Sequence, residues 1–149
     1  MSTIFTIGYE RATPPAVLAA LADARVEVLA DVRARPLSRK PGFSKSALKA
    51  AIEEAGMDYR HFRDVGTPPE GREAARRGDR ATLARVYAGQ LELPEALAAM
   101  AELRQLALDK RICLLCFCRD ADKCHRSLLV AELLPDFQRV DLAPALPGA

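Results

Sequence analysis

One apolar run constrains the fold more than any other feature of the chain. Residues 112–118 read Ile-Cys-Leu-Leu-Cys-Phe-Cys, and charged residues flank this run on both sides. A strand that is apolar at every position, and not at every second one, is typical of a central strand in a parallel sheet that helices cover on both faces. Parallel strands need long crossover connections, which are usually helices. We therefore expect strands and helices to alternate along the chain.

The remainder of the sequence shows this alternation. Runs rich in β-branched and aromatic residues predict four further strands, at residues 3–9, 26–33, 57–62 and 137–142. Apolar residues at helical spacing predict helices that begin near Thr13, Ser44 and Pro94, and residues 70–90 also look helical. Asp122 predicts the cap of a last helix from Lys123 to about Leu134.

This order of elements predicts a three-layer α/β/α sandwich around a mostly parallel central sheet. We find no linker or internal repeat, so we expect residues 1–142 to form a single α/β domain. Residues 143–149 contain two prolines and a glycine and are expected to form a loose C-terminal tail.

Composition limits the classes of protein to which the chain can belong. Half of the 149 residues are apolar, which suffices for one domain with a buried core. No apolar run approaches the ~20 residues needed to cross a bilayer, and the first residues do not resemble a signal peptide. We therefore expect a cytoplasmic protein without a membrane partner. In that compartment the four cysteines should be thiols, metal ligands or redox groups and not disulfides.

The basic residues are unevenly distributed. Lys and Arg number 22 against 20 Asp and Glu, a net charge of +2 that gives no global attraction to nucleic acid. Basic residues nevertheless gather after the second strand, and Arg prevails over Lys there, as a phosphate or carboxylate site requires. These residues are Arg33, Arg35, Arg39, Lys40 and Lys45. A second basic stretch, from Arg72 to Arg85, is interleaved with acids, so we interpret it as a solvated helix face.

Polar side chains follow the predicted strands at the edge where open α/β sheets bind ligands, outside the carboxyl ends of the strands. These are Tyr9 after the first strand, Asp31 and Arg33 at the end of the second, His61 after the third, and Cys116 and Cys118 at the end of the fourth. Directly afterwards, Cys124-His125-Arg126 falls in the first turn of a helix, where unpaired N–H groups favour an anion. We expect phosphate as the anion, with a carboxylate as the alternative, and Arg33, Arg39, Arg126, Tyr9 and His61 as the ligand-binding residues.

Three side chains at this edge have the chemistry for catalysis. His125 can act as an acid or a base, and Asp31 can act as a base or orient a basic group. Cys124 can act as a nucleophile, because a helix start beside His and Arg favours its thiolate. No Arg stands six positions after Cys116, Cys118 or Cys124, so the phosphate loop of the cysteine phosphatases is not matched.

A purely structural interpretation of the same residues stays open. Cys124 could be a small core residue, and His125 could hydrogen bond to a backbone carbonyl. Arg126 could pair with Asp120 or Asp31, and Asp31 could instead form a buried ion pair with Arg33 that holds the loop.

Metal binding is a further interpretation. Two ligands at the strand end, Cys116 and Cys118, could converge with Cys124 and His125 at the helix start. The spacing differs from that of the common zinc modules, so we assign neither a metal ligand nor a cofactor from the sequence.

A resemblance to a known family rests on several short motifs. They are Thr6-Ile-Gly-Tyr9, Asp31-Val-Arg33 with Pro36, Ser38, Arg39 and Phe43, then Tyr59 and His61, and Leu114-Leu-Cys116 leading to Cys124-His-Arg126. Through them the chain, from Thr6 to about Leu134, resembles the bacterial and archaeal domain of unknown function family 488. The resemblance implies a small α/β fold with a polar site near these strand ends, and it implies no particular reaction. Family members usually have Glu where this chain has Cys118, and a Gly pair where it has Gly66-Thr67. The first difference argues against an acid-dependent mechanism or gives the role of that acid to Asp31.

These observations lead to one main functional expectation and two alternatives. We expect the strand ends to bind a phosphate-bearing ligand, either a nucleotide or a nucleic acid, and to process it if the protein is an enzyme. One alternative is a non-catalytic nucleotide or nucleic-acid binding module that uses the loop from Arg33 to Lys45. The other is a thiol- or metal-dependent protein centred on Cys116, Cys118 and Cys124. The sequence does not decide whether the protein is an enzyme.

Overall fold

The computed structural model describes residues 2–148 and is built on a five-stranded sheet in which all neighbouring strands run parallel. The strands are β1 (Thr3–Gly8), β2 (Val28–Asp31), β3 (Asp58–His61), β4 (Ile112–Cys116) and β5 (Gln138–Leu142). Their order across the sheet is β3-β2-β4-β1-β5, which puts β4 at the centre. Met1 of the expected domain and Ala149 of the expected tail lie outside the described residues.

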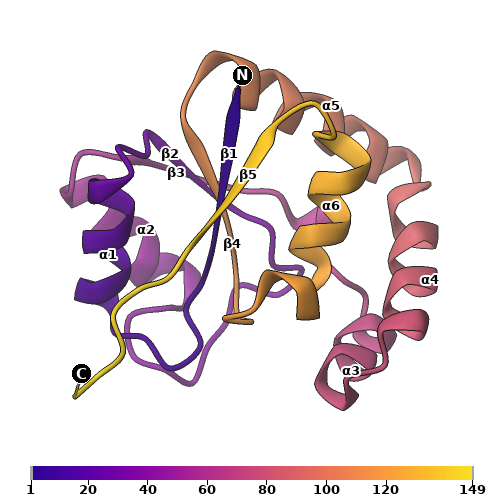
Figure 1. Cartoon of the computed structure of the whole chain (residues 1–149), viewed down its shortest axis with the longest axis horizontal. Coiled ribbons are helices and arrows are strands. Elements are labelled where there is room, and N and C mark those ends of the chain that lie inside the picture. Colours follow the sequence, from indigo (N-terminus) through magenta and orange to yellow (C-terminus); the bar gives the residue numbers. More distant parts are fainter. Residues whose placement is uncertain (1, 149) are drawn as a thin grey trace.

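Helices cover both faces of this sheet (Figure 1). One face carries α1 (Pro14–Asp23) and α2 (Lys45–Glu54). The other side carries α3 (Pro69–Arg77), α4 (Arg80–Leu91), α5 (Pro94–Asp109) and α6 (His125–Leu133), with the short 3-10 turns η1 (Arg63–Val65) and η2 (Ala121–Lys123). The predicted three-layer α/β/α sandwich is therefore confirmed. None of the helices between residues 2 and 148 is long and apolar enough to cross a membrane.

The strand order explains why the helices divide in this way. From β1 through β2 to β3 the chain moves towards one edge of the sheet, and from β3 through β4 to β5 it moves back. Right-handed crossovers in opposite directions put their helices on opposite faces. The chain therefore changes faces at β3.

Two apolar cores fill the spaces between the sheet and the helices on either face. Val17 and Leu21 of α1 pack with Leu48 and Ile52 of α2 against one face of the sheet. On the other face the core is formed by Tyr87, Met100, Leu103 and Leu129 from α4, α5 and α6. Strand β4 contributes to both cores, because Cys113 and Leu115 belong to the first and Ile112 and Leu114 to the second. The apolar run thus forms the central strand that its sequence predicted.

The stretch predicted as helical at residues 70–90 forms two helices. Gly78 ends α3 in the left-handed conformation, at φ 74°, which a residue without Cβ adopts readily. Asp79 then caps α4, since its Oδ1 accepts a hydrogen bond from the Thr82 N–H at 3.1 Å. The break at Gly78 turns the chain between α3 and α4.

The last helix begins later than predicted. It starts at His125 and not at Lys123, and its N-cap is Cys124, whose sulfur accepts the Arg126 N–H. Asp122 does not cap it, because the preceding residues form η2, which Asp120 caps through the Asp122 N–H at 2.9 Å.

The strands that lead to the pocket end earlier than predicted. Beyond Asp31, the Val32 and Arg33 carbonyls accept hydrogen bonds from histidine side chains and not from a neighbouring strand. Beyond Cys116, the Phe117 carbonyl accepts the Glu10 N–H, so Cys118 lies in a loop and not at the strand end. These loops carry the candidate site.

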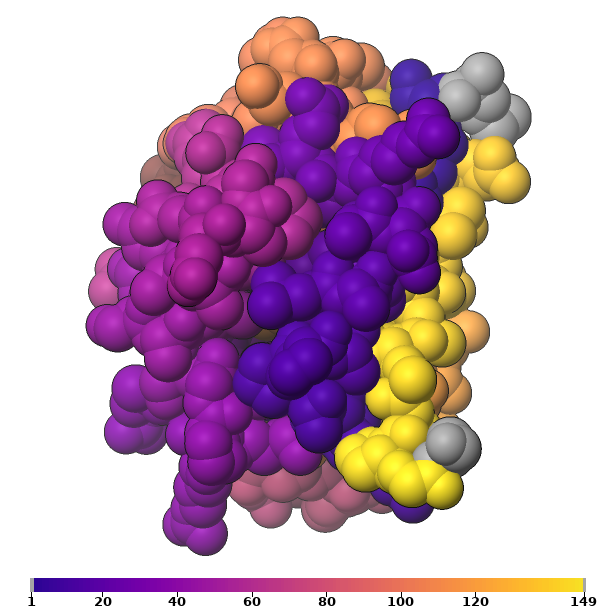
Figure 2. Space-filling view, turned by 90° about the vertical axis from the view of Figure 1, so that its left-hand side faces the viewer, coloured from indigo at the N-terminus to yellow at the C-terminus, as the bar shows by residue number. Residues whose placement is uncertain are grey.

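The segment after β5 runs along one side of the molecule. In Figure 2 the face of α1 and α2 is covered by N-terminal residues, and the yellow segment after β5 follows one side of it. Within the expected tail, Pro144 is buried and its carbonyl accepts a hydrogen bond from Arg119 Nη2 at 2.9 Å. That contact ties residues after β5 to the loop after β4.

Candidate functional site

A pocket of about 1070 Å³ lies at the carboxyl ends of β1, β2 and β4. Residues 9–11, 33–35, 37–40, 116–120 and 123–125, at and after the ends of these three strands, line it, and residues of α3 and α4 supply a further wall. The chain leaves β1 and β2 towards one face of the sheet and leaves β4 towards the other. A crevice opens where such connections diverge, and this is where open α/β sheets bind ligands.

The pocket is strongly basic. Nine basic side chains line it, against the two acids Glu10 and Asp120. The basic residues are Arg11, Arg33, Arg35, Arg39, Lys40, Arg72, Arg76, Arg119 and Lys123. Because the whole chain carries a net charge of only +2, this pocket concentrates positive charge that the overall balance conceals.

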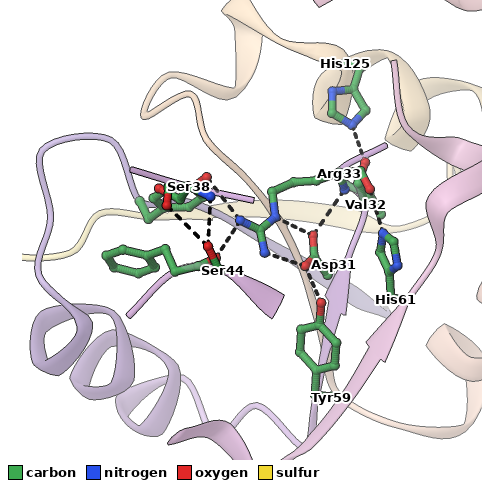
Figure 3. Close-up of polar contacts among 10 residues, drawn as sticks. Asp31, Val32, Arg33, Ser38, Ser44, Tyr59, His61 and His125 are labelled. Carbon is green, nitrogen blue, oxygen red and sulfur yellow. Dashed lines mark hydrogen bonds and ion pairs between the residues drawn. The ribbon is translucent and has the colours of Figure 1, made fainter. Parts of the chain in front are cut away.

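A buried ion pair organises the loop after β2 (Figure 3). Arg33 donates from Nε to Asp31 Oδ1 at 2.8 Å and from Nη2 to Oδ2 at 2.7 Å. Its Nη1 donates to the Tyr9 hydroxyl at 3.1 Å and to the Phe43 carbonyl at 2.7 Å. The sequence left open whether Asp31 pairs with Arg33 or Arg126, and the structure places it with Arg33.

The Asp31 carboxylate is fully buried and fully hydrogen bonded. Besides the Arg33 side chain, it accepts the Arg33 backbone N–H at 3.1 Å and the Tyr59 hydroxyl. Burial and the nearby Asp31 charge raise the pKa of Tyr59 and keep the phenol protonated. Burial opposes the charge of Arg33, but the hydrogen bonds and charge of Asp31 outweigh it and raise the pKa of the guanidinium. Asp31 and Arg33 therefore hold the loop as a charged pair.

Both histidines of the chain hold consecutive carbonyl groups of this loop. The His125 Nε2 lies 2.7 Å from the Val32 oxygen, and the His61 Nε2 lies 2.7 Å from the Arg33 oxygen (Figure 3). A carbonyl only accepts, so Nε2 carries the proton in each ring. Burial lowers the pKa of His125 and favours its neutral form. The structural interpretation of His125, as a donor to a backbone carbonyl, is confirmed.

Two cysteine sulfurs lie close together in the part of the pocket wall formed by the end of β4 and the loop after it. The Cys116 and Cys124 Sγ atoms are 3.0 Å apart, and both residues line the pocket. Cys124 Sγ also accepts hydrogen bonds from Arg126, at 3.3 Å from Nε and 3.4 Å from the backbone N–H. The ligand atoms of Cys116, Cys124 and His125 all lie within 4.8 Å of one another, which is close enough to hold a metal ion. Cys113 is buried in the core next to α1 and α2.

Arg126 is a buried cation without a carboxylate partner among residues 2–148. It is 1% exposed, and its Nη2 donates to the Cys118 carbonyl at 2.5 Å. It pairs with neither of the two acids that the structural interpretation offered, because Asp120 caps η2 and Asp31 binds Arg33. Its Nη1 has no hydrogen-bond partner in the described part of the chain. The Cys124 sulfur lies 3.3 Å from the Nε of this guanidinium and can supply the opposite charge as a thiolate.

The surroundings of Cys124 favour that ionised form. Burial opposes a charge on the sulfur, but hydrogen bonds from the Cys116 and Cys118 thiols and the charge of Arg126 outweigh it. Together they hold the pKa of Cys124 well below its ordinary value of 9.0. Burial raises the pKa of Cys116 well above that value, so this thiol keeps its proton.

These opposite shifts predict a pH dependence of stability. Between the lowered folded-state pKa of Cys124 and about pH 9, the unfolded chain binds more protons, so the free energy of unfolding rises with pH. Above pH 9 the raised pKa values of Cys113 and Cys116 reverse the slope. Between about pH 7 and 9, above the range in which an unfolded histidine titrates, urea denaturation with reductant present should show the rise in the wild type and not in Cys124→Ser. Parallel curves for the two proteins would contradict an ionised Cys124.

The structure brings most of the predicted site residues to one pocket. Tyr9, Arg33, Arg39, Cys124 and His125 line it. The other three do not line the pocket, but each contacts a residue that does. Asp31 pairs with the Arg33 side chain, and His61 hydrogen bonds to the Arg33 carbonyl. Arg126 donates to the Cys124 sulfur.

Sequence reasoning missed the contribution of α3. Arg72 and Arg76 were interpreted as part of a solvated helix face, but both line the pocket. Arg72 is also fixed by a hydrogen bond from Nη1 to the Thr67 carbonyl at 2.9 Å. Their spacing of four residues, which puts them on one face of a helix, is the signal that could have identified them.

Fold and site together define a class of protein: a three-layer α/β protein with a basic pocket at its strand ends and a thiol cluster in the pocket wall. The chain belongs to the domain of unknown function family DUF488, whose model matches residues 13–133. The resemblance inferred from the motifs is thereby confirmed, while Thr6 to Tyr9 lie outside the matched range. Comparisons with curated proteins and with solved structures find no match.

Proposed function

We propose that the strand-end pocket binds a phosphate-bearing small molecule of nucleotide size. The observation that carries this proposal is the lining, in which nine basic side chains face two acids. Arginine forks bind phosphate oxygens in pairs, and a concave basic site strengthens that attraction. The volume of about 1070 Å³ is at the upper end of small-ligand pockets.

Arginine donors of the pocket come from two segments of the chain. Arg35 and Arg39 in the loop after β2 are exposed and form no ion pair among the described residues. Arg72 and Arg76 of α3 also line the pocket, where Arg72 donates one N–H to the Thr67 carbonyl and Arg76 lies 3.6 Å from the Glu73 carboxylate. Four of the five guanidinium N–H groups of Arg33 donate hydrogen bonds within the protein, so its main role is to hold the loop and not to bind the ligand.

An aromatic surface accompanies these donors. Tyr9 stacks on Phe43 with ring centroids 4.5 Å apart, and Phe117 meets Tyr9 edge-on at 5.5 Å. Phe117 lines the pocket and is 47% exposed. An exposed aromatic ring beside a phosphate site can stack on a nucleobase, which favours a nucleotide over inorganic phosphate.

Calorimetric titration with ATP and with inorganic phosphate tests the proposal. We expect the Arg39→Gln/Arg72→Gln variant to weaken ATP binding on the order of 100-fold, because it removes two charge-assisted donors. The matched control is Arg80→Gln/Arg85→Gln, which removes the same charge from exposed positions outside the pocket and should leave the affinity unchanged.

Other outcomes of the titration contradict the proposal. Equal losses in both double variants would show that only net charge matters. Tighter binding of a single-stranded oligonucleotide, with a steep dependence on salt, would instead support a nucleic-acid binding module. Failure of the wild type to bind ATP at all would remove the nucleotide from consideration.

A further inference from the structure

Two cysteine thiols in the pocket wall lie almost within bonding distance. The Cys116 and Cys124 Sγ atoms are 3.0 Å apart, and both cysteines are free. A disulfide has an S–S length of about 2.05 Å, so a displacement of roughly 1 Å would join them. They come from the end of β4 and the start of α6, which already pack together.

Arg126 donates two hydrogen bonds to one of these sulfurs. Cys124 Sγ accepts the Arg126 Nε and backbone N–H groups at 3.3 and 3.4 Å, and the Cys116 Sγ lies 3.0 Å from it, a contact in which either sulfur can be the donor. Hydrogen bonds to a charged form stabilise it, so this arrangement suits a thiolate at Cys124 and a thiol at Cys116.

Charge balance leads to the same assignment. Arg126 is a buried cation with no carboxylate partner in the described part of the chain. A buried charge without a counter-charge is strongly unfavourable. A Cys124 thiolate supplies that counter-charge, and the pair is then neutral.

We propose that Cys124 is a nucleophilic thiolate that reduces small hydroperoxides, and that Cys116 is its resolving thiol. Both residues keep only 2–3% of their surface exposed, so the oxidant must be small. The proposal does not depend on the nucleotide ligand, and the two experiments probe different atoms.

The reaction balances with hydroperoxide as the oxidant. The Cys124 thiolate attacks the terminal peroxide oxygen, the O–O bond breaks, and a sulfenic acid forms while the alkoxide or hydroxide leaves and takes a proton from solvent. The Cys116 sulfur then attacks Cys124 Sγ, the S–O bond breaks, and water leaves with the Cys116 proton. The two thiols lose two electrons, the peroxide gains them, and a dithiol reductant restores the starting state.

The neighbouring guanidinium suits this step. Arg126 Nε holds the attacking sulfur, and its Nη1 keeps a donor that no protein acceptor takes. Negative charge develops on the leaving oxygen, and a cation beside the sulfur stabilises it.

The same cluster could bind a metal through Cys116, Cys124 and His125. Two thiolates, a neutral imidazole and a divalent cation sum to zero and leave Arg126 without a counter-charge. The charge of Arg126, held 3.3 Å from Cys124 Sγ, also repels a cation bound at that sulfur. These contacts favour the thiolate without a metal.

Peptide mapping of the wild-type protein tests the proposal. After reduction and treatment with one equivalent of hydrogen peroxide, we expect the intact mass to fall by two hydrogen atoms and a disulfide to join Cys116 and Cys124. With dithiothreitol present, the protein should consume peroxide catalytically. A wild type that forms no such bond overturns the proposal, and this readout needs no variant to fold.

Variants assign the roles of the two sulfurs. Cys116→Ser should stop at a sulfenic acid on Cys124, Cys124→Ser should not react, and Arg126→Lys should slow the first step by roughly a factor of ten. The matched control is Cys113→Ser, which changes a buried thiol outside the pocket and should react as the wild type does. A stoichiometric metal in protein purified without a tag, or equal rates for Cys124→Ser and wild type, would refute the assignment.

Discussion

Replacing Asp31 with Asn lowers the free energy of unfolding by about 3–5 kcal/mol, because it leaves the buried Arg33 cation without a counter-charge. The carboxylate is 0% exposed and accepts hydrogen bonds from two groups of the Arg33 side chain, from the Arg33 N–H and from Tyr59. An amide cannot accept at both ends. Urea denaturation at neutral pH measures the loss, and ATP titration of the folded fraction should show weaker binding because the loop after β2 loosens.

Two further variants make this expectation specific. Asp58→Asn removes the same charge from an exposed position at the start of β3 and should change stability by less than about 0.5 kcal/mol. Asp31→Asn/Arg33→Met removes both charges and should recover part of the loss. A double variant that is less stable than Asp31→Asn would contradict the uncompensated-charge explanation.

Replacing Gly8 with Ala destabilises the protein by about 3 kcal/mol through a steric clash. A Cβ at this position would lie 1.8 Å from the Cys118 carbonyl oxygen and 2.9 Å from the Arg119 Cα. These are backbone atoms of the loop after β4, which cannot move aside as a flexible side chain would. The loop would have to leave the end of β1, and with it the pocket wall that contains Cys124. Thermal denaturation and ATP titration measure the two effects.

Gly89 provides the matched control for this substitution. It lies exposed within α4, and a Cβ there would meet no atom within 4 Å. Gly89→Ala should therefore stabilise the protein by about 1 kcal/mol through helix propensity. The same Gly→Ala substitution is thus expected to lower the free energy of unfolding at Gly8 and to raise it at Gly89. A similar small effect at both positions would show that the loop after β4 accommodates the added methyl group.

The sequence predicts the layers and the position of the pocket because both depend on short-range patterns. The apolar run at residues 112–118 identifies the central strand, and the strand-end rule then selects Tyr9, Arg33, Cys124 and His125. All four line the observed pocket. Periodicity and topology suffice for this step, since they need no knowledge of side-chain packing.

The sequence does not predict which buried charged side chains pair with each other. The sequence offers Asp31 two cations, and only the packing of the loop shows that Arg33 fills both carboxylate oxygens and leaves Arg126 without an acid. The role of Arg72 depends on where the helix pair α3 and α4 lies, which the break at Gly78 decides. The position of a helix relative to a distant loop cannot be predicted from a short-range sequence pattern.

The buried Arg126 links oxidation of the thiols to occupancy of the pocket. A Cys116–Cys124 disulfide carries no charge, so its formation would release the guanidinium from its counter-ion and make the wall more positive. An anionic ligand would then bind the oxidised protein more tightly than the reduced one. By thermodynamic reciprocity the bound ligand would raise the stability of the disulfide by the same factor. Anion binding would therefore shift the redox potential of the thiols, and oxidation would shift the affinity for the anion. Both shifts would report the same coupling free energy, which arises from Arg126.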